Sequence, residues 1–404
     1  MSKKIRVGHI GARMYYGVPR AIYHASLLEK LYTDITINKG LPKFISKLGF
    51  TKGLALREVK EIPSNKIMHL PLWGFRNFWR LSQAKNENQS NTANFNNGMA
   101  LERFMMRDNL ANVDAVMMVG SSSQHIFEFA KTKGIATVKE QIIAPAGIYN
   151  AIIAKYLGAY STWENVPYSE TSAAFWQDVA TKEWQFTDHV ICGSQFVKDS
   201  IVELGYSAEK VEVIPYGVPL LMQKNPCKEY DGKRKLRILF VGTVCLRKGI
   251  QYLLEIAESL QATCEIKICG KSSLNREIHE RYGAFVDFVG HIPRTEISSY
   301  YEWADVFVLP TLFEGSATVC YEAIQYKIPI ITTVNSGVFL NDGEGVQLIE
   351  MGSSSSLKKA IENYVEHPEL VKEHSQILEK HMFYASTEAY MQRIEAFFKD
   401  KVFA

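Results

Sequence analysis

Two glutamates with seven residues between them follow an apolar stretch that ends at Pro310. Glu314 comes first and Glu322 completes the motif. Ser316 is of a residue type that often caps helices, so we expect a helix to begin near it, with Glu314 in the preceding loop and Glu322 on the second turn. At 1.5 Å per residue, Ser316 and Glu322 lie roughly 9 Å apart along this helix. Carboxylates at such a spacing can accept hydrogen bonds from hydroxyl groups at two ends of one ligand.

The start of this helix also offers a place for phosphate. The first N–H groups of a helix have no intrahelical acceptor and attract anions, and here they belong to Ala317 and Thr318. Gly315 has no side chain, so the backbone can approach a ligand closely. A ligand with a diphosphate between a sugar and a ribose fits this pattern, because a carboxylate then meets hydroxyl groups on either side of the phosphates.

The elements that must position these residues alternate between strands and helices. Short β-rich runs with helical stretches between them indicate parallel strands joined by crossover helices. Strands are expected at residues 5–10, 34–37, 66–70, 114–119, 136–139, 189–192, 211–214, 236–241, 264–269, 286–289, 305–309, 329–332 and 346–349. We expect residues 82–97, which are rich in Asn, Gln and Ser, to form a mobile loop.

The fold class expected is α/β, with two doubly wound Rossmann-like domains that face each other across a cleft. A stretch rich in proline and glycine after residue 214 interrupts the rhythm and is typical of a linker. We therefore predict an acceptor-side domain at 1–215, a linker at 216–235, a donor-side domain at 236–382, and a C-terminal helix within 383–404 that crosses back to the first domain. Ligands of such sheets bind beyond the carboxyl ends of the strands, and two facing sheets create a cleft there.

At Glu314 and Glu322 the sequence resembles the retaining glycosyltransferases of family 4, which have the GT-B fold. Their mark is a Glu, seven residues and a second Glu after a strand that ends in proline. The likeness continues through Leu239–Gly242 and Arg247–Gly249, which look like the first strand and phosphate-binding turn of the donor domain, and covers about residues 188–342.

The resemblance implies roles for individual residues. Lys248 falls where the family has a diphosphate-binding lysine. Thr243 stands where the family often has an arginine, and Arg247 can supply the missing charge. The catalytic residues implied are Glu314, Lys248 and Arg247. The donor contacts implied are Glu322, Gly315, Ser316, Ala317, Thr318, Gly242, Thr243, Gly270, His291 and Ile292.

The first 180 residues resemble the family mainly in their alternation of strands and helices. The glycine-rich turn after the first strand keeps Gly17 but has Tyr16 where a second glycine is usual. Many members have a cleft histidine after a middle strand, and His125 is the nearest substitute here, unless it lies on a helix surface. We expect acceptor-side contacts at Gly17, Tyr16 and His125. Lys327 replaces a glycine at a helix end, which is a local conformational cost.

The activity implied is the transfer of a hexose from a nucleoside-diphosphate sugar to a hydroxyl of a glycan or lipid-linked glycan, with retention, as in polysaccharide biosynthesis. The sequence has no Asp-x-Asp motif at a strand end, so we expect neither a metal nor a cofactor. The alternative is a non-catalytic sugar-nucleotide or glycan-binding protein on the same fold. A nicotinamide-dependent oxidoreductase is disfavoured, because Gly8-His-Ile-Gly11 departs from Gly-x-Gly-x-x-Gly.

The net charge of +3 is too small to indicate nucleic acid, but it is unevenly distributed. Residues 39–85 hold ten Lys or Arg and two acidic residues, a local charge of +8, among several aromatics. Such a segment suits an anionic membrane surface, or is simply a solvated basic face over core aromatics. No apolar run approaches the length of a membrane span, and the six cysteines form no CxxC pair, so we expect free thiols and a cytoplasmic location, at most peripheral at the inner face of the membrane.

Overall fold

The computed structural model describes residues 3–38, 57–84, 87–120, 122–164, 170–221 and 226–404. The first part of the basic segment 39–85 therefore lies outside the described residues. Within the described ranges, no helix is both long enough and apolar enough to cross a membrane.

The first sheet has seven parallel strands in the order β3-β2-β1-β4-β5-β6-β7. The strands are β1 Ile5–His9, β2 Leu28–Thr33, β3 Ile67–His69, β4 Ala115–Val119, β5 Ala136–Gln141, β6 His189–Cys192 and β7 Val211–Val213. Central strands such as β1 and β4 are buried along their whole length, as expected for a parallel sheet that is covered on both faces. The strand order reverses beside β1, so the crevice at the carboxyl ends of β1 and β4 is the switch point of this domain.

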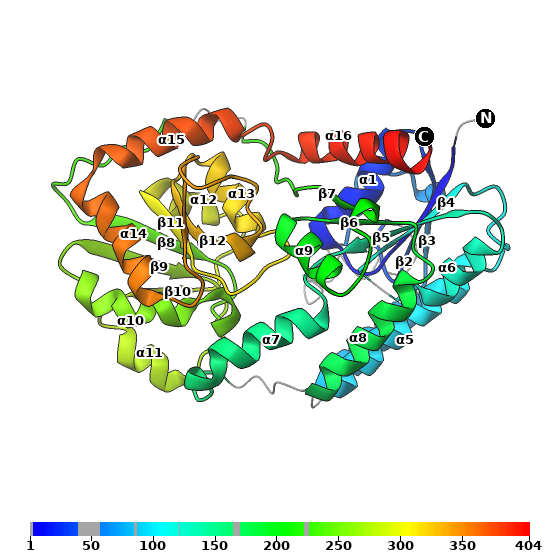
Figure 1. Ribbon diagram of the computed structural model, residues 1–404, viewed down its shortest axis with the longest axis horizontal. Helices are drawn as coiled ribbons and strands as arrows, with labels where there is room; N and C mark the ends of the chain where they lie inside the picture. Colours follow the sequence, from blue (N-terminus) through cyan, green and yellow to red (C-terminus); the bar gives the residue numbers. More distant parts are fainter. Residues whose placement is uncertain (1–2, 39–56, 85–86, 121, 165–169, 222–225) are drawn as a thin grey trace.

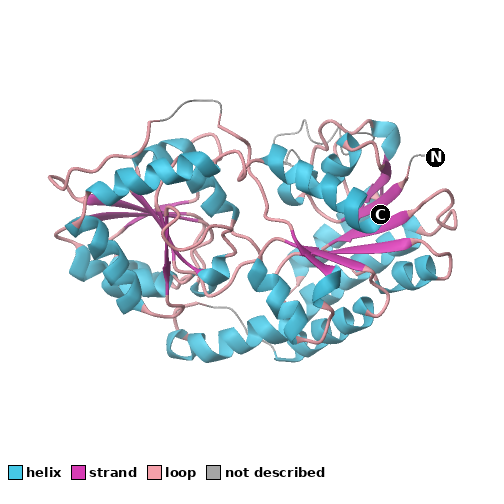
Figure 2. Cartoon of the chain, turned by 45° about the horizontal axis from the view of Figure 1, so that its top comes forward, coloured by secondary structure: helices cyan, strands magenta, loops and turns pink. Residues whose placement is uncertain are grey.

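The second sheet has six parallel strands in the order β10-β9-β8-β11-β12-β13. The strands are β8 Leu236–Val241, β9 Cys264–Cys269, β10 Asp287–Gly290, β11 Val306–Leu309, β12 Ile330–Thr333 and β13 Val346–Ile349. Figure 2 shows helices on both faces of each sheet. The structure thus confirms the two Rossmann-like α/β domains predicted from the strand and helix rhythm.

The helices fall into two groups along the chain. Those between the strands of the first sheet are α1 Gly17–His24, α4 Pro71–Gln83, α5 Glu87–Met105, α6 Gln124–Lys131, α7 Ala146–Leu157, α8 Glu170–Trp184 and α9 Gln195–Glu203. Those that follow are α10 Ile250–Leu260, α11 Arg276–Tyr282, α12 Ile297–Trp303, α13 Thr318–Gln325, α14 Ser354–Glu366, α15 Glu369–His381 and α16 Thr387–Phe397. Single turns are η1 Arg13–Tyr16, η2 Ser64–Lys66, η3 Gly158–Tyr160, η4 Ala208–Lys210, η5 Leu246–Lys248, η6 Val334–Ser336 and the π-helical η7 Phe398–Val402.

Two of the expected elements are wrong. The second strand is β2 and ends at Thr33, so residues 34–37 follow it rather than form it. Asp34 accepts hydrogen bonds there from the Gly11 amide and from Arg57, which holds this segment as a loop. The polar stretch 82–97 is also not a loop, because α4 ends at Gln83 and α5 begins at Glu87.

Two local expectations are confirmed. Lys327 follows Tyr326, the C-cap of α13, and has a φ of 54°, a left-handed conformation that glycine adopts at less cost. All six cysteines are free, and five of them are buried.

Two segments connect the domains and lie side by side. Val218 forms a parallel bridge with Ser386, its amide donates to the Ala385 carbonyl at 3.0 Å, and its carbonyl accepts from the Thr387 amide at 2.9 Å. The helix that follows, α16, returns to the first domain and packs on α1 (Figure 1).

Candidate active site

The Glu314 carboxylate forms ion pairs with two cations at once. Its Oε1 lies 2.7 Å from Lys248 Nζ and 2.9 Å from Arg247 Nη1. Burial favours a raised pKa for Glu314, but the charges of Lys248 and Arg247 outweigh it and leave the pKa below its ordinary value. The structure therefore brings together the three residues expected to be catalytic, with the carboxylate ionised at neutral pH.

The loop that carries Glu314 and the turn that carries the two cations hold each other in place. Arg247 donates from Nη1 to the Phe313 carbonyl at 2.9 Å. In return the Arg247 carbonyl accepts from the Leu312 amide at 2.9 Å and from Thr311 Oγ1 at 3.0 Å. These bonds lie on either side of the ion pairs, so the charges meet in a fixed geometry.

Two glycines make the close packing at the carboxyl ends of β8 and β9 feasible. A Cβ on Gly270 would lie 1.7 Å from the Gly242 carbonyl oxygen, and a Cβ on Gly242 would lie 3.3 Å from Lys248 Nζ. Both glycines have positive φ, which is 138° at Gly242 and 152° at Gly270. The Lys248 side chain thus extends over the backbone of Gly242. Thr243, the residue after Gly242, is exposed.

Glu322 lies on α13 and has a different environment. Its Oε2 accepts a hydrogen bond from Tyr301 Oη at 2.6 Å, and Tyr301 stacks on Tyr326 with ring centroids 4.9 Å apart. Burial raises the pKa of Glu322, against the opposing effects of Tyr301 and Arg294. No sequence pattern links Tyr301 to Glu322, since the two residues lie on different helices.

The helix start differs from the expectation. Ser316 is not the cap, because α13 begins at Thr318 and its cap position is Ala317. Ser316 Oγ instead lies 2.7 Å from Tyr321 Oη and donates to the Gly337 carbonyl. The Ala317 amide, expected to be free for phosphate, donates to the Ser336 carbonyl at 2.9 Å. The expected phosphate seat is therefore wrong at Ala317, because turn η6 uses that donor.

The two domains meet at the Glu314 loop. Ser194 Oγ of the first domain donates to the Gly315 carbonyl at 2.6 Å. A Cβ on Gly315 would lie 1.7 Å from the Ile142 carbonyl oxygen, and a Cβ on Gly193 would lie 2.7 Å from Ser316 Cβ. Gly315 is thus needed where backbones of the two domains touch, and the ion-paired site borders this seam.

His291 and Ile292 follow β10 on the donor side, where His291 is exposed and Ile292 is half-buried. Two positions further on, the Arg294 guanidinium lies 4.8 Å from the Tyr15 ring centroid of the first domain. This contact bridges the domains on the side of Glu322. The expected contact of His291 and Ile292 with a nucleobase stays a prediction.

The expected acceptor-side residues do not gather at one place. Tyr16 is fully buried, with its ring 5.1 Å from that of His9, so it packs in the core and cannot reach an acceptor in this conformation. Gly17 begins α1 with ordinary helical φ of −52°. His125 Nδ1 lies 3.5 Å from Glu102 on α5, which places it on a helix surface.

A buried polar cluster lies instead at the carboxyl edge of the first sheet, and sequence reasoning missed it. Arg13 Nη2 donates to Tyr216 Oη at 3.1 Å, and Tyr216 Oη donates to Glu140 Oε1 at 3.1 Å. Both ring nitrogens of His9 are buried without a hydrogen-bond partner among the residues that the structure describes, and burial lowers the His9 pKa to about 3, so the ring is neutral. Burial also raises the pKa of Glu140. The sequence alone carries no clear signal for this cluster, because Arg13, Glu140 and Tyr216 lie far apart in the chain.

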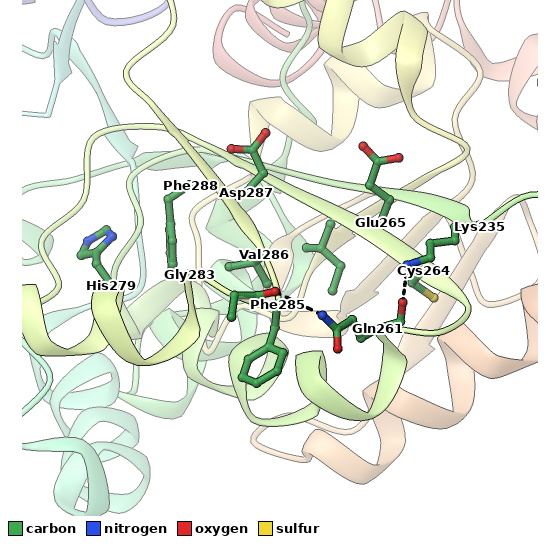
Figure 3. Close-up of a pocket in the computed structure, with 12 residues that line it drawn as sticks. Lys235, Gln261, Cys264, Glu265, His279, Gly283, Phe285, Val286, Asp287 and Phe288 are labelled. Atoms are coloured by element: carbon green, nitrogen blue, oxygen red, sulfur yellow. Dashed lines mark hydrogen bonds between the residues drawn. The ribbon is translucent and has the colours of Figure 1, made fainter.

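A separate hollow of about 600 Å³ lies near the edge of the second sheet (Figure 3). It borders the beginnings of β9 and β10, where Glu265 and Asp287 project side by side. Parallel sheets bind ligands at the opposite ends of their strands, near Gly270 and Gly290. This hollow is therefore not the site of Glu314 and Lys248.

Two Rossmann-like domains with a charged site at their seam define a GT-B-like α/β protein. Residues 235–367 match the family model described as "Glycosyl transferases group 1", so the second domain is a glycosyl transferases group 1 domain.

Curated relatives match part of the chain. A protein named as a teichuronic acid biosynthesis glycosyltransferase, TuaC of Bacillus subtilis strain 168, is 31% identical over 173 residues, which are 40% of this chain and 42% of that protein. The amylovoran biosynthesis glycosyltransferase AmsK of Erwinia amylovora is 28% identical over 160 residues, 36% of this chain and 39% of AmsK. The matched segments thus span less than half the length of either relative.

Solved structures are similar over nearly the whole chain. Sucrose-phosphate synthase from Thermosynechococcus elongatus has a TM-score of 0.67 at 15% identity, covering 99% of both chains. Anabaena Alr3699/HepE in complex with UDP and glucose has a TM-score of 0.60 at 13% identity, covering 98% of this chain and 100% of the other. At these identities the likeness establishes the fold alone.

Proposed function

We propose that this protein is a glycosyltransferase of glycan biosynthesis that transfers a hexose from a nucleoside-diphosphate sugar to a hydroxyl of a glycan or lipid-linked glycan. The observation that carries the proposal is the Glu314 carboxylate between Lys248 and Arg247, inside a glycosyl transferases group 1 domain. The names of TuaC and AmsK, which refer to polysaccharide biosynthesis, and the UDP bound to HepE support it.

The roles in the proposed reaction follow from the charges. The bond between the anomeric carbon and the diphosphate breaks, and the acceptor oxygen bonds to the same face of that carbon, so the configuration is retained. The acceptor proton passes to the leaving phosphate. Lys248 and Arg247 stabilise the charge that develops on the diphosphate, and the Thr318 amide at the start of α13 adds a donor. Glu314 holds sugar hydroxyls, and Glu322 holds the ribose.

The remaining donor contacts are proposed around this centre. Gly242, Thr243 and Gly270 line the carboxyl ends of β8 and β9, and the loop with His291 and Ile292 flanks the nucleobase. On this proposal residues 1–215 form the acceptor side, residues 236–382 the donor side, and residues 216–235 the linker. The C-terminal helix within residues 383–404, α16, then belongs to the acceptor side.

The test is a panel of sugar nucleotides, first for thermal stabilisation and then for transfer to glycan acceptors without added metal. We expect one donor to raise the melting temperature and to yield a product whose anomeric configuration, read by NMR, equals that of the donor. An inverted product would exclude the retaining mechanism. Binding without transfer or slow hydrolysis would favour a non-catalytic sugar-nucleotide-binding protein, and no binding by any donor would reject both.

We also propose that the acceptor side contacts an anionic membrane surface through α4. Leu72, Phe78 and Trp79 are large apolar residues with exposed fractions of 82%, 71% and 64%. Arg76 and Arg80 lie on the same helix, Arg76 exposed and Arg80 half-buried. Apolar side chains that enter the interface beside arginines that meet phosphate headgroups are typical of interfacial helices. A lipid-linked acceptor would be presented at such a surface.

A further inference from the structure

Helix α7 precedes β6 of the first sheet, yet the residues that follow it dock on the second domain. Figure 1 shows α7 running toward α10 and α11. Tyr160 donates from Oη to Glu255 of α10 at 2.5 Å. The Trp163 carbonyl accepts from the Asn275 amide at 2.8 Å, just before α11. We refer to residues 146–164 as the arm.

The arm contacts the Glu314 loop through an aromatic stack. The rings of Tyr149 and Phe313 are 5.6 Å apart and nearly parallel, with an interplanar angle of 19°. The Arg247 guanidinium also lies 5.6 Å from the Phe313 ring centroid, and it holds the Phe313 carbonyl. Phe313 is the residue directly before Glu314. Tyr149 therefore packs against the residue that joins Glu314 to Arg247.

The arm contacts the cationic turn through a carboxylate. Glu164 Oε2 accepts a hydrogen bond from the Leu246 amide at 2.7 Å. Leu246 is the first residue of η5, the turn that carries Arg247 and Lys248. The backbone of Glu164 is fixed in turn by an antiparallel bridge with Leu274. The first domain thus reaches both halves of the ion-paired site by separate contacts.

Misplacement of charged groups by about 1 Å can cost on the order of a hundredfold in rate, and stabilisation of a leaving diphosphate requires groups that are fixed before the reaction. Tyr149 contacts the Glu314 loop through the Phe313 ring. Glu164 contacts the cationic turn through the Leu246 amide and also interacts electrostatically with Arg247.

We propose that Tyr149 and Glu164 are positioning residues, through which the first domain holds Glu314, Arg247 and Lys248 of the second domain in their catalytic arrangement. The proposal rests on the proposed function for its catalytic consequence, but the structural coupling stands on the contacts alone. Neither residue belongs to the motifs by which the sequence resembles glycosyltransferases.

The experiment compares Tyr149→Ala and Glu164→Ala with the conservative variants Tyr149→Phe and Glu164→Gln. Phenylalanine retains the stacking ring, and the glutamine amide oxygen can still accept from Leu246. Phe175→Ala, an aromatic that is 40% exposed on α8, is the matched control. Amide hydrogen exchange is followed in peptides that cover 246–249 and 311–315, and kcat and KM are measured for the donor identified in the panel.

We expect faster exchange in 311–315 for Tyr149→Ala and in 246–249 for Glu164→Ala, with restoration in both conservative variants and no change in Phe175→Ala. We expect kcat to fall roughly ten- to a hundredfold in the two alanine variants, with KM nearly unchanged. Unchanged exchange in both segments, or full kcat in the alanine variants, would overturn the proposal. Altered exchange in a protein that transfers no sugar would instead reject the proposed function and retain the coupling.

Discussion

On the proposed function, the two cations that would bind the diphosphate are paired with Glu314. The Glu314 carboxylate neutralises Lys248 and Arg247 at 2.7 and 2.9 Å, so both side chains are held in one position. A diphosphate that enters must share these cations with the glutamate. The ion pairs therefore preorganise the site, and they also limit how tightly it can hold a product with the same charge as Glu314.

This arrangement predicts that Glu322→Gln mainly loses affinity for the nucleotide, whereas Glu314→Gln mainly loses turnover. Glu322→Gln removes an acceptor for ribose hydroxyls, so it should weaken both the nucleoside diphosphate and the sugar nucleotide. A hydrogen bond to a charged group contributes about 1.5 to 3 kcal/mol, or a roughly ten- to hundredfold loss in affinity. Glu314→Gln frees two cations, so it should bind the diphosphate at least as well as the wild type and mainly lose turnover.

Calorimetry with the diphosphate and with the sugar nucleotide separates the two roles, and thermal melts check that both variants fold. Normal diphosphate binding by Glu322→Gln would remove that residue from the ribose site. Full turnover by Glu314→Gln would show that its ion pairs serve the fold alone.

Lys248→Ala should raise the donor KM and lower kcat. The Lys248 side chain is 12% exposed and lies over Gly242, where its ammonium can make a charge-assisted contact to the diphosphate that strengthens as the leaving group departs. Steady-state kinetics with the preferred donor measures both parameters. Lys271→Ala, which changes a lysine just beyond β9 without an ion pair to Glu314, is the comparison. Kinetics equal to the wild type would place Lys248 outside the site.

At the scale of elements, α4 and α5 show where sequence reasoning failed. Asparagine favours turns and caps over helix interiors, so 82–97 read as a loop. In the structure α5 packs against α4 and α8, with Ala93 and Asn97 buried, and Gly98 allows close approach to Ser122. Packing of this kind outweighs a weak local preference, and it depends on residues far away in the sequence.

The α4 surface makes a prediction about membranes. Protein should sediment with anionic vesicles at low salt, and added salt should weaken binding because it screens the arginines. The double variant Phe78→Gln and Trp79→Gln should sediment less, while Phe383→Gln, a change at a residue that is 53% exposed between α15 and α16, should behave as the wild type. Equal sedimentation with neutral and anionic vesicles would contradict the proposed contact with anionic membranes, both for α4 and for the wider segment 39–85.

The strands of the second domain were predictable because they are short β-rich runs that alternate with helical stretches. Residues 236–241, 264–269 and 346–349 agree with β8, β9 and β13 to the residue. The family resemblance also assigned Glu314, Arg247 and Lys248 to one candidate site, and the structure brings these residues together. The contacts of Tyr301 with Glu322 and of Tyr149 with Phe313 were not predictable, because they join segments whose proximity only the assembled fold creates.

At the scale of the whole molecule, the relation between the two domains depends on two segments that run side by side between them, around Val218 and around Ser386. We call these two segments the crossings. Besides the bridge between Val218 and Ser386, Arg393 of α16 donates to the Pro215 carbonyl at 2.9 Å. The site lies at a seam to which both domains contribute, through Ser194 and Gly315. Any change in the crossings should therefore alter the site from a distance, without a change in its residues.

Gly217 is the position at which this can be tested. A Cβ there would lie 2.1 Å from the Ser386 carbonyl oxygen, so Gly217→Ala must push the two crossings apart. We expect a loss of stability of about 1 to 3 kcal/mol, typical of overpacking, seen as a lower melting temperature, together with a changed domain arrangement in small-angle scattering and lower turnover. Gly158→Ala is the matched control, because a Cβ there meets no atom within 4 Å and its φ of −54° suits alanine, so it should melt at or slightly above the wild-type temperature. If Gly217→Ala melts and scatters as the wild type does, the crossings tolerate displacement and do not set the relation between the domains.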